Sequence, residues 1–158
     1  MKNLDFLEEI QSQSTWRLFG LSVITGGIYE AYYIHKLTKQ INPIVEIGKR
    51  LSNALINSIF VLCYLSVIFR IVEKFFEENM EIGIATLLIM LVTRIALITW
   101  AFKVRSSIHV HCDLDKKTYM WFSGFWTFFY APIYLNYRIN CLVENMNHPD
   151  FVIEPNPS

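Results

Sequence analysis

The sequence predicts an all-α integral membrane protein in which four helices cross the bilayer as one bundle. Three observations support this prediction. The 158 residues are 53% apolar and 15% aromatic, which is richer than a typical soluble domain. The apolar residues form long blocks with few charges, each about as long as a hydrocarbon core is thick. Helices that are hydrophobic all round would need a larger soluble protein to bury them.

The first span, expected at about residues 16–35, is the weakest of the four. Its apolar part from Leu18 to Ile34 is 17 residues long and contains Gly26, Gly27 and Glu30. A pair of glycines lowers helix propensity by roughly 2 kcal/mol relative to alanine. The segment can therefore cross the membrane, kink or re-enter, and we prefer a crossing helix.

The second, third and fourth spans are expected at about residues 51–70, 82–102 and 118–138. Leu51 to Phe69 holds no charge over 19 residues, and Thr118 to Tyr137 holds none over 20. At about 1.5 Å per residue, each of these blocks reaches roughly 28 to 30 Å as a helix. The third block has Arg94 as its only charge. All four spans belong to one membrane domain over residues 1–158, with a mobile tail at 147–158.

The distribution of charge suggests an orientation. The loops at residues 35–50 and 103–118 carry eight lysines and arginines, whereas the segments on the other side of a four-span bundle carry five. The positive-inside rule then places the two basic loops in the cytoplasm and both termini outside. If the first span re-enters instead of crossing, the amino terminus changes side. Residues 1–15 lack the basic start and apolar middle of a secretory signal. Insertion must therefore be directed by the spans themselves.

Comparison of the chain with itself at an offset of 105 residues suggests an internal repeat of the first and fourth spans. Trp16 aligns with Trp121 in this comparison. The pair Gly26-Gly27 aligns with the pair Ala131-Pro132, so both helices are interrupted. Because the two spans would run in opposite directions, the pattern is consistent with an inverted repeat. Chance matches between aromatic-rich helices are the alternative explanation.

The stretch from Trp16 to Asn42, WRLFGLSVITGGIYEAYYIHKLTKQIN, resembles the opening motif of a known family. The residues that carry the resemblance are Thr25, Gly27, Ile28, Tyr29, Tyr32 and Tyr33. The family is the bacterial membrane family called domain of unknown function 4234. In this opening motif, Tyr33 stands where tryptophan is more usual. The later stretch FWTFFYAPIYLNYRIN, which ends at Asn140, is similar to the closing span of the family. The resemblance implies a multi-pass protein of the bacterial plasma membrane and implies no chemistry.

Arg94 is the sharpest candidate for a functional residue. A charged side chain at the middle of a membrane costs at least about 2.5 kcal/mol, so it usually faces a partner or a wet cavity. The predicted depths of Arg94 and Glu30 differ by about 3 Å, which allows an ion pair. Asn53 and Asn57, four residues apart on the second span, can extend the network. The alternatives to an ion or ligand pathway are a structural pair and an arginine that snorkels toward the headgroups.

A loop with potential metal ligands follows the third span. Its weak candidates are His109, His111 and Cys112. Their spacing fits no standard zinc motif, because no helical i, i+4 pair and no second cluster accompany them. We therefore expect no metal and no other cofactor. The three cysteines are odd in number and widely spaced, so we expect no disulfide framework.

Aromatic residues are concentrated near the predicted ends of the spans, where amphipathic rings anchor proteins in the membrane interface. The expected interface aromatics are Trp16, Tyr29, Tyr32, Tyr33, Trp121, Tyr134 and Tyr137. The basic loops would also attract anionic headgroups of the membrane lipids. Because the formal net charge is zero, bulk electrostatics give no support to nucleic-acid binding.

These features favour a non-enzymatic membrane scaffold or sensor. In this hypothesis the protein forms homo-oligomers and presents its basic loops to lipids or to a cytosolic protein partner. The alternative is a small oligomeric channel or transporter with Arg94 and Glu30 in a polar pathway. An enzyme is disfavoured, because the sequence contains no GxSxG, Walker, HExxH or dinucleotide motif.

Overall fold

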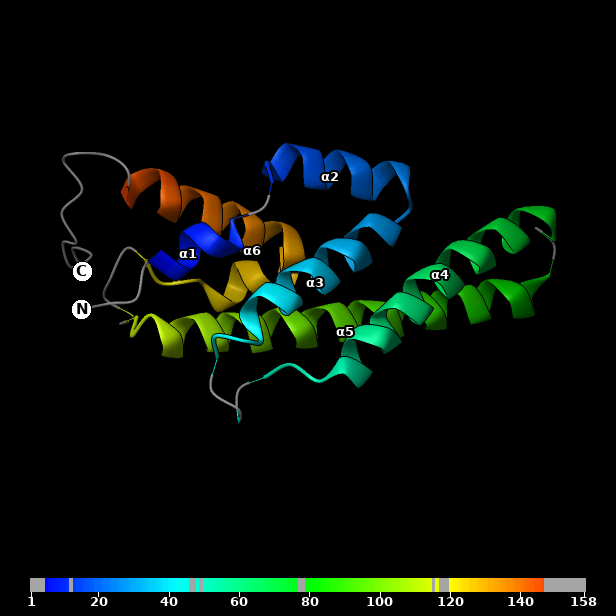
Figure 1. The fold of residues 1–158 in the computed structure, drawn as a ribbon. Coiled ribbons are helices and arrows are strands. Elements are labelled where there is room, and N and C mark those ends of the chain that lie inside the picture. Colours follow the sequence, from blue (N-terminus) through cyan, green and yellow to red (C-terminus); the bar gives the residue numbers. More distant parts are fainter. Residues whose placement is uncertain are drawn as a thin grey trace.

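The computed structural model describes residues 5–11, 13–45, 48, 50–76, 79–114, 116 and 120–146. These residues form α-helices and no strand, as the sequence predicts. Figure 1 shows that α4 and α5 form one long pair, and that the other helices cover only part of it. The helices are α1 Asp5–Ile10, α2 Thr15–Ile24, α3 Ile28–Ile41, α4 Asn53–Phe75, α5 Met80–His111 and α6 Gly124–Met146. The tail predicted to be mobile, residues 147–158, lies outside the described residues, as do the loop cations Lys49 and Lys117.

Helices α4 and α5 are both long and apolar enough to cross a membrane. They correspond to the predicted second and third spans. Each begins at a polar cap: the Ser52 hydroxyl accepts from the Ala54 amide at 3.1 Å, and the Asn79 side chain accepts from the Glu81 amide at 3.0 Å. With 32 residues, α5 is roughly 48 Å long, so its last turns extend beyond a hydrocarbon core.

The first predicted span, residues 16–35, is two helices and not one. The chain reverses between α2 and α3 at Gly26 and Gly27, whose φ angles are 62° and 100°. The Gly27 amide donates to the Ser22 carbonyl at 2.8 Å, which closes the end of α2. Two successive left-handed residues turn the chain back, and only glycine adopts this conformation without strain. The structure thus corrects the prediction of a crossing helix; we call residues 13–41 the first hairpin.

The fourth predicted span, residues 118–138, also folds back. Its bend lies at Ala131, which has φ 34° and ψ −114° and precedes Pro132. The Ser123 amide donates to the Tyr134 hydroxyl at 2.9 Å, so the two sides of the bend lie together. Proline lacks an amide hydrogen and forces the preceding residue out of the helical conformation, which explains the break. We call residues 121–146 the second hairpin.

Both hairpins open toward the same end of the α4–α5 pair. The side-chain amides of Asn136 and Asn140 donate to the Gln13 carbonyl at 3.1 and 2.9 Å, which joins the open end of the first hairpin to the second arm of the second hairpin. At this end α1 packs on α3 and α6, and its Phe6 ring lies 4.8 Å from the His111 ring at the end of α5. Figure 1 shows both turns pointing toward the connection between α4 and α5.

We call the end that holds α1 and His111 the basal end, and the end where α4 connects to α5 the distal end. The expected inverted repeat is wrong, because the two copies run in the same direction along the pair. The N-terminal segment lies at the same end as the basic loops, which is the placement expected if the first span re-enters. Helix α1 lies at the basal end, where the Gln40 side chain of α3 donates to the Glu9 carbonyl at 3.0 Å.

The core fills the space between the hairpins and the basal half of α5. Trp100 and Tyr33 are its largest buried side chains, with 0% and 1% of their surface exposed. The Trp100 indole donates to the Thr38 hydroxyl at 2.9 Å, so this buried polar group has its partner. Tyr33 is therefore a core residue, and its predicted place in the membrane interface is wrong.

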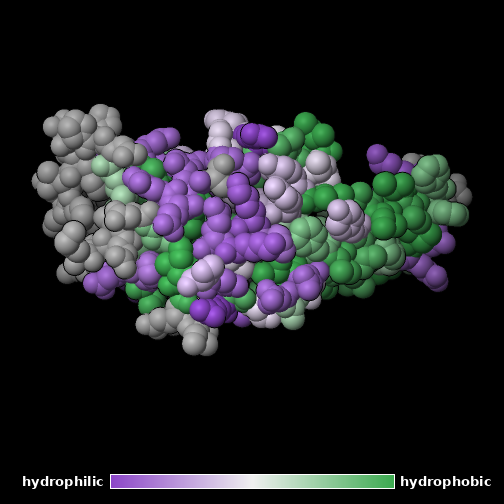
Figure 2. All heavy atoms as spheres, in the orientation of Figure 1, coloured by the Kyte–Doolittle hydropathy of each residue, from purple (hydrophilic) through white to green (hydrophobic). Residues whose placement is uncertain are grey.

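The distal part of the pair exposes an apolar surface. Figure 2 shows hydrophobic residues over this part and a mostly hydrophilic surface over α1 and α3. The exposed apolar side chains on α4 and α5 include Val61, Tyr64, Leu65, Ile68, Ile71, Phe75, Ile84, Leu87, Leu88, Leu91, Val92 and Ile95. A continuous apolar surface of this kind is typical of helices that face lipid.

Candidate functional site

A cavity of about 310 Å³, lined by both polar and apolar residues, lies where the turn of the first hairpin meets α4 and α5. Its lining residues are Gly26, Gly27, Glu30, Cys63, Ser66, Arg70, Met90, Thr93, Arg94 and Leu97. We call it the central cavity. It brings Glu30 and Arg94 to one site, as their predicted depths suggested, and it adds Arg70. The hydroxyls of Ser66 and Thr93 lie 2.8 Å apart in its wall and link α4 to α5.

Arg70 holds the turn of the first hairpin against α4. Its Nη2 donates to the Gly26 carbonyl, and its Nε donates to the Ser66 carbonyl at 3.2 Å. A Cβ atom added to Gly26 would lie 3.0 Å from Nη2 of Arg70, so glycine is needed for this close approach. The sequence placed Arg70 at the end of an apolar block, which gave no signal that it caps a turn 44 residues away.

Arg94 does the same for the turn of the second hairpin. Its Nη2 donates to the carbonyl of Phe129. In a continuous helix this carbonyl would accept from Ile133, but the bend at Ala131 and Pro132 interrupts the helix at this point. Arg94 therefore supplies the hydrogen-bond donor that the Phe129 carbonyl lacks at the bend. Each arginine of the central cavity caps one hairpin turn.

Glu30 lies in the first turn of α3, half-buried in the wall of the cavity. No ion pair within 4.0 Å joins Glu30 to Arg70 or Arg94 in the described part of the chain. In place of the predicted ion pair, the structure has a cavity that these residues share. The Glu30 carboxylate offsets part of the positive charge of Arg70 and Arg94 over a longer distance. Chemically, such a cavity can hold water or a polar solute.

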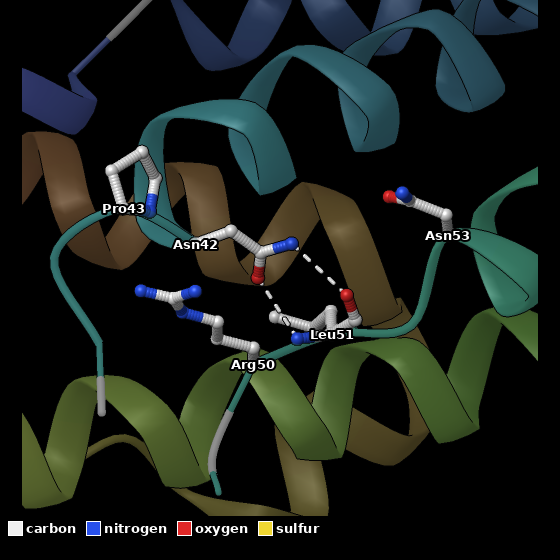
Figure 3. A pocket seen from close by; sticks show the side chains of 5 residues that line it. All are labelled: Asn42, Pro43, Arg50, Leu51 and Asn53. Atoms are coloured by element: carbon white, nitrogen blue, oxygen red, sulfur yellow. Dashed lines mark hydrogen bonds between the residues drawn. The ribbon is translucent and has the colours of Figure 1, made fainter. Parts of the chain in front are cut away.

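The two asparagines predicted to extend this network lie elsewhere. Asn53 lines a separate cavity of about 390 Å³ toward the basal end, together with Asn42, Pro43, Arg50 and Leu51. Figure 3 shows Asn42 facing Leu51, with which it exchanges hydrogen bonds of 2.8 and 2.9 Å, and Asn53 standing apart at the start of α4. Asn57 is exposed on α4. The bridge from Asn42 fixes the end of α3 to the segment that leads into α4.

His109 is used in packing at the basal end. Its Nε2 accepts from the Phe122 amide at 3.1 Å, and its ring stacks on Trp121 at a centroid distance of 3.8 Å. Burial, with a smaller effect of the nearby Arg105 guanidinium, lowers the pKa of His109 to about 4. The imidazole is therefore neutral at pH 7, with the proton on Nδ1.

The other two weak metal candidates do not converge with His109. The His111 ring packs against Phe6. Cys112 is buried, and burial raises the pKa of its thiol to about 11. In the described part of the chain, no three His, Cys, Asp or Glu side chains gather in a position to hold a metal ion.

The predicted interface aromatics divide into three groups. Trp16, Tyr32 and Tyr137 are exposed, with 82%, 54% and 51% of their surface accessible. Tyr29, Trp121 and Tyr134 are half-buried. The hydroxyls of Tyr29 and Tyr134 bond within the hairpins, to the Gln13 side chain and the Ser123 amide. Tyr33 is buried, as described above.

Comparison with known families matches residues 13–110 to the family described as domain of unknown function (DUF4234). This match spans more than half of the chain. The chain belongs to this family.

The DUF4234 match contains the first hairpin, α4 and every lining residue of the central cavity. It ends before the second hairpin, so the closing stretch that ends at Asn140 lies outside it. Comparisons with curated proteins and with solved structures give no match.

Proposed function

We propose that this protein is a non-enzymatic scaffold embedded in the bacterial plasma membrane. Helices α4 and α5 cross the bilayer, the two hairpins enter it from the basal side without crossing, and the basal end faces the cytoplasm. The observation that carries this proposal is that both hairpins and α1 gather at one end of two helices that are long and apolar enough to span a membrane.

The charge at the two ends supports this orientation. The described cations toward the basal end are Arg17, Lys36, Lys39, Arg50, Lys103, Arg105, Lys116 and Arg138. The described charges next to the distal connection are Glu73, Lys74 and Glu81. The positive-inside rule places the cation-rich end in the cytoplasm. There it can bind anionic lipids or an acidic cytosolic protein, and self-association would multiply the binding surface.

Cysteine labelling in a cysteine-free background tests the topology, with single cysteines at the exposed positions Ser14, Ser106 and Glu81. Two crossing helices with re-entrant hairpins predict that Ser14→Cys and Ser106→Cys react only from the cytoplasm and Glu81→Cys only from outside. A four-span bundle places Ser14 on the same side as Glu81. Labelling of Ser14→Cys from outside would therefore overturn the arrangement.

A channel or transporter is the second candidate, and the central cavity is the observation that favours it. Glu30, Arg70 and Arg94 line this cavity at mid-span, where charged residues often mark a solute path. Against it, both arginines are engaged in capping the hairpin turns. Flux of ions or small solutes into vesicles that contain the protein, abolished by Glu30→Gln, would replace the scaffold with this function.

A further inference from the structure

A cluster of cations and aromatic rings surrounds Trp121 at the base of the second hairpin. The Arg105 guanidinium carbon lies 5.2 Å from the Trp121 ring centre, and the Lys116 ammonium lies 6.0 Å from it. Arg138 reaches the same place from α6, where its Nη2 donates to the Trp121 carbonyl at 3.5 Å. We call Arg105, Lys116, Trp121 and Arg138 the Trp121 cluster. Arg105 and Lys116 thus bring positive charge to the indole ring of Trp121, and Arg138 brings it to the backbone of the same residue and to the neighbouring Phe122 ring.

Arg105 is held in place by the chain, and no carboxylate among the described residues forms an ion pair with it. Its Nε donates a hydrogen bond to the Phe122 carbonyl at 2.6 Å. Arg105 is half-buried. Neither Arg105 nor Lys116 forms an ion pair with a carboxylate in the described part of the chain. A half-buried charge of this kind gains free energy when an anion completes the site.

The cluster lies at the level expected for lipid headgroups. The apolar block of α5 ends at Phe102, and Arg105 follows one helical turn later on the same helix. The Arg105 guanidinium also lies 5.7 Å from the Phe102 ring, which marks the boundary between apolar and charged surface. Tryptophan and arginine side chains are typical of this interfacial zone.

We propose that the Trp121 cluster binds the phosphate group of an anionic phospholipid in the cytoplasmic leaflet. The Nη donors of Arg105 contact the phosphate oxygens, Lys116 adds a second charge, and the Trp121 ring packs against the glycerol region of the lipid. The level of the site in the bilayer rests on the topology proposed above. The chemistry of binding does not, because a solubilised protein keeps the cluster in either orientation.

Native mass spectrometry of the detergent-solubilised protein tests this proposal, with phosphatidylglycerol and phosphatidylcholine as the probes. We expect selective retention of phosphatidylglycerol, and a loss of about tenfold in its affinity for Arg105→Gln, which removes a charge-assisted bidentate contact. Lys103→Gln is the matched control, because it removes an exposed cation from the same helix. It should change the affinity less than twofold.

A second variant and a competition experiment complete the test. Lys116→Gln removes charge from a loop residue whose contact in the described chain is the Trp121 ring, so it should weaken phosphatidylglycerol binding without loss of helical circular dichroism. Equal losses for Arg105→Gln and Lys103→Gln would overturn the site in favour of diffuse attraction. Displacement of the lipid by glycerol phosphate would overturn the lipid as ligand. Labelling of Ser106→Cys from outside would instead reject the topology and leave the measured binding intact.

Discussion

The two hairpins have the same outline but different turns. The first turns through Gly26 and Gly27, both with positive φ, whereas the second turns through Ala131 at φ 34° followed by Pro132. Both turns are capped by an arginine from the α4–α5 pair, and the caps come from different helices. Arg70 on α4 caps the first turn and Arg94 on α5 caps the second.

The difference shows two ways to turn a helical chain back on itself. The first hairpin does so with little backbone strain, and the second does so with a strained residue. Glycine adopts left-handed angles freely, so the first turn needs only space beside Arg70. Alanine at positive φ is strained by about 1–3 kcal/mol, and the surrounding contacts must hold it there. The second turn is therefore the one that depends more on its arginine. The following predictions test this comparison.

The largest effect is expected from replacing both turn glycines of the first hairpin. Gly26→Ala with Gly27→Ala places two Cβ atoms at left-handed angles, at a cost of about 2–4 kcal/mol in total. The added clash with Arg70 increases this loss. Unfolding of the solubilised protein in a denaturing detergent measures the change. Gly20→Ala is the control, because Gly20 lies inside α2 with open space around it and should gain about 0.5–1 kcal/mol.

The next effect separates the two arginine caps. Arg94→Gln should destabilise the protein by about 1–3 kcal/mol, because it weakens the contact to the Phe129 carbonyl at a bend that supplies no helical donor. Hydrogen exchange should accelerate at residues 129–135 and stay unchanged at 22–28. Arg70→Gln should show the reverse pattern. Equal acceleration of both turns in both variants would mean that the arginines do not act on separate hairpins.

A smaller effect, an increase in stability, is expected from a substitution at the second turn. Ala131→Gly relieves strain at φ 34° but loses some conformational entropy, so we expect a gain of about 1 kcal/mol in the free energy of unfolding. The same measurement as for the glycine variants reports it. A loss of stability would show that Ala131 is not strained, and the contrast between the two turns would then disappear.

The smallest effect is confined to the base of the second hairpin. His109 has a folded-state pKa of about 4, below its ordinary value of 6.5, so the unfolded chain binds the proton more readily. Stability is therefore complete above pH 6.5 and falls as the pH drops toward 4. We expect the melting temperature to decrease by a few degrees between pH 7 and pH 5. His109→Gln, which can still accept from the Phe122 amide, should flatten this dependence; an unchanged slope would assign it to other groups.

The central cavity was predictable only in part. Depth along the helices brought Glu30 and Arg94 to the same level, and the structure places both in one cavity. The same reasoning failed for Asn53 and Asn57, because it assumed that the first hairpin crosses the membrane beside them. Helical spacing puts residues on a face but does not say which neighbour covers that face.

By itself, the sequence determined where the long apolar helices run and where two other helices break. Block length sets how far a helix can reach, and glycine pairs or proline act on the backbone wherever they occur. Only the tertiary structure decided the direction of the chain after each break. That direction depends on which donors satisfy the carbonyls at the turn, and these donors, Arg70 and Arg94, lie 44 and 35 residues away. Contacts at such separations leave no local pattern in the sequence.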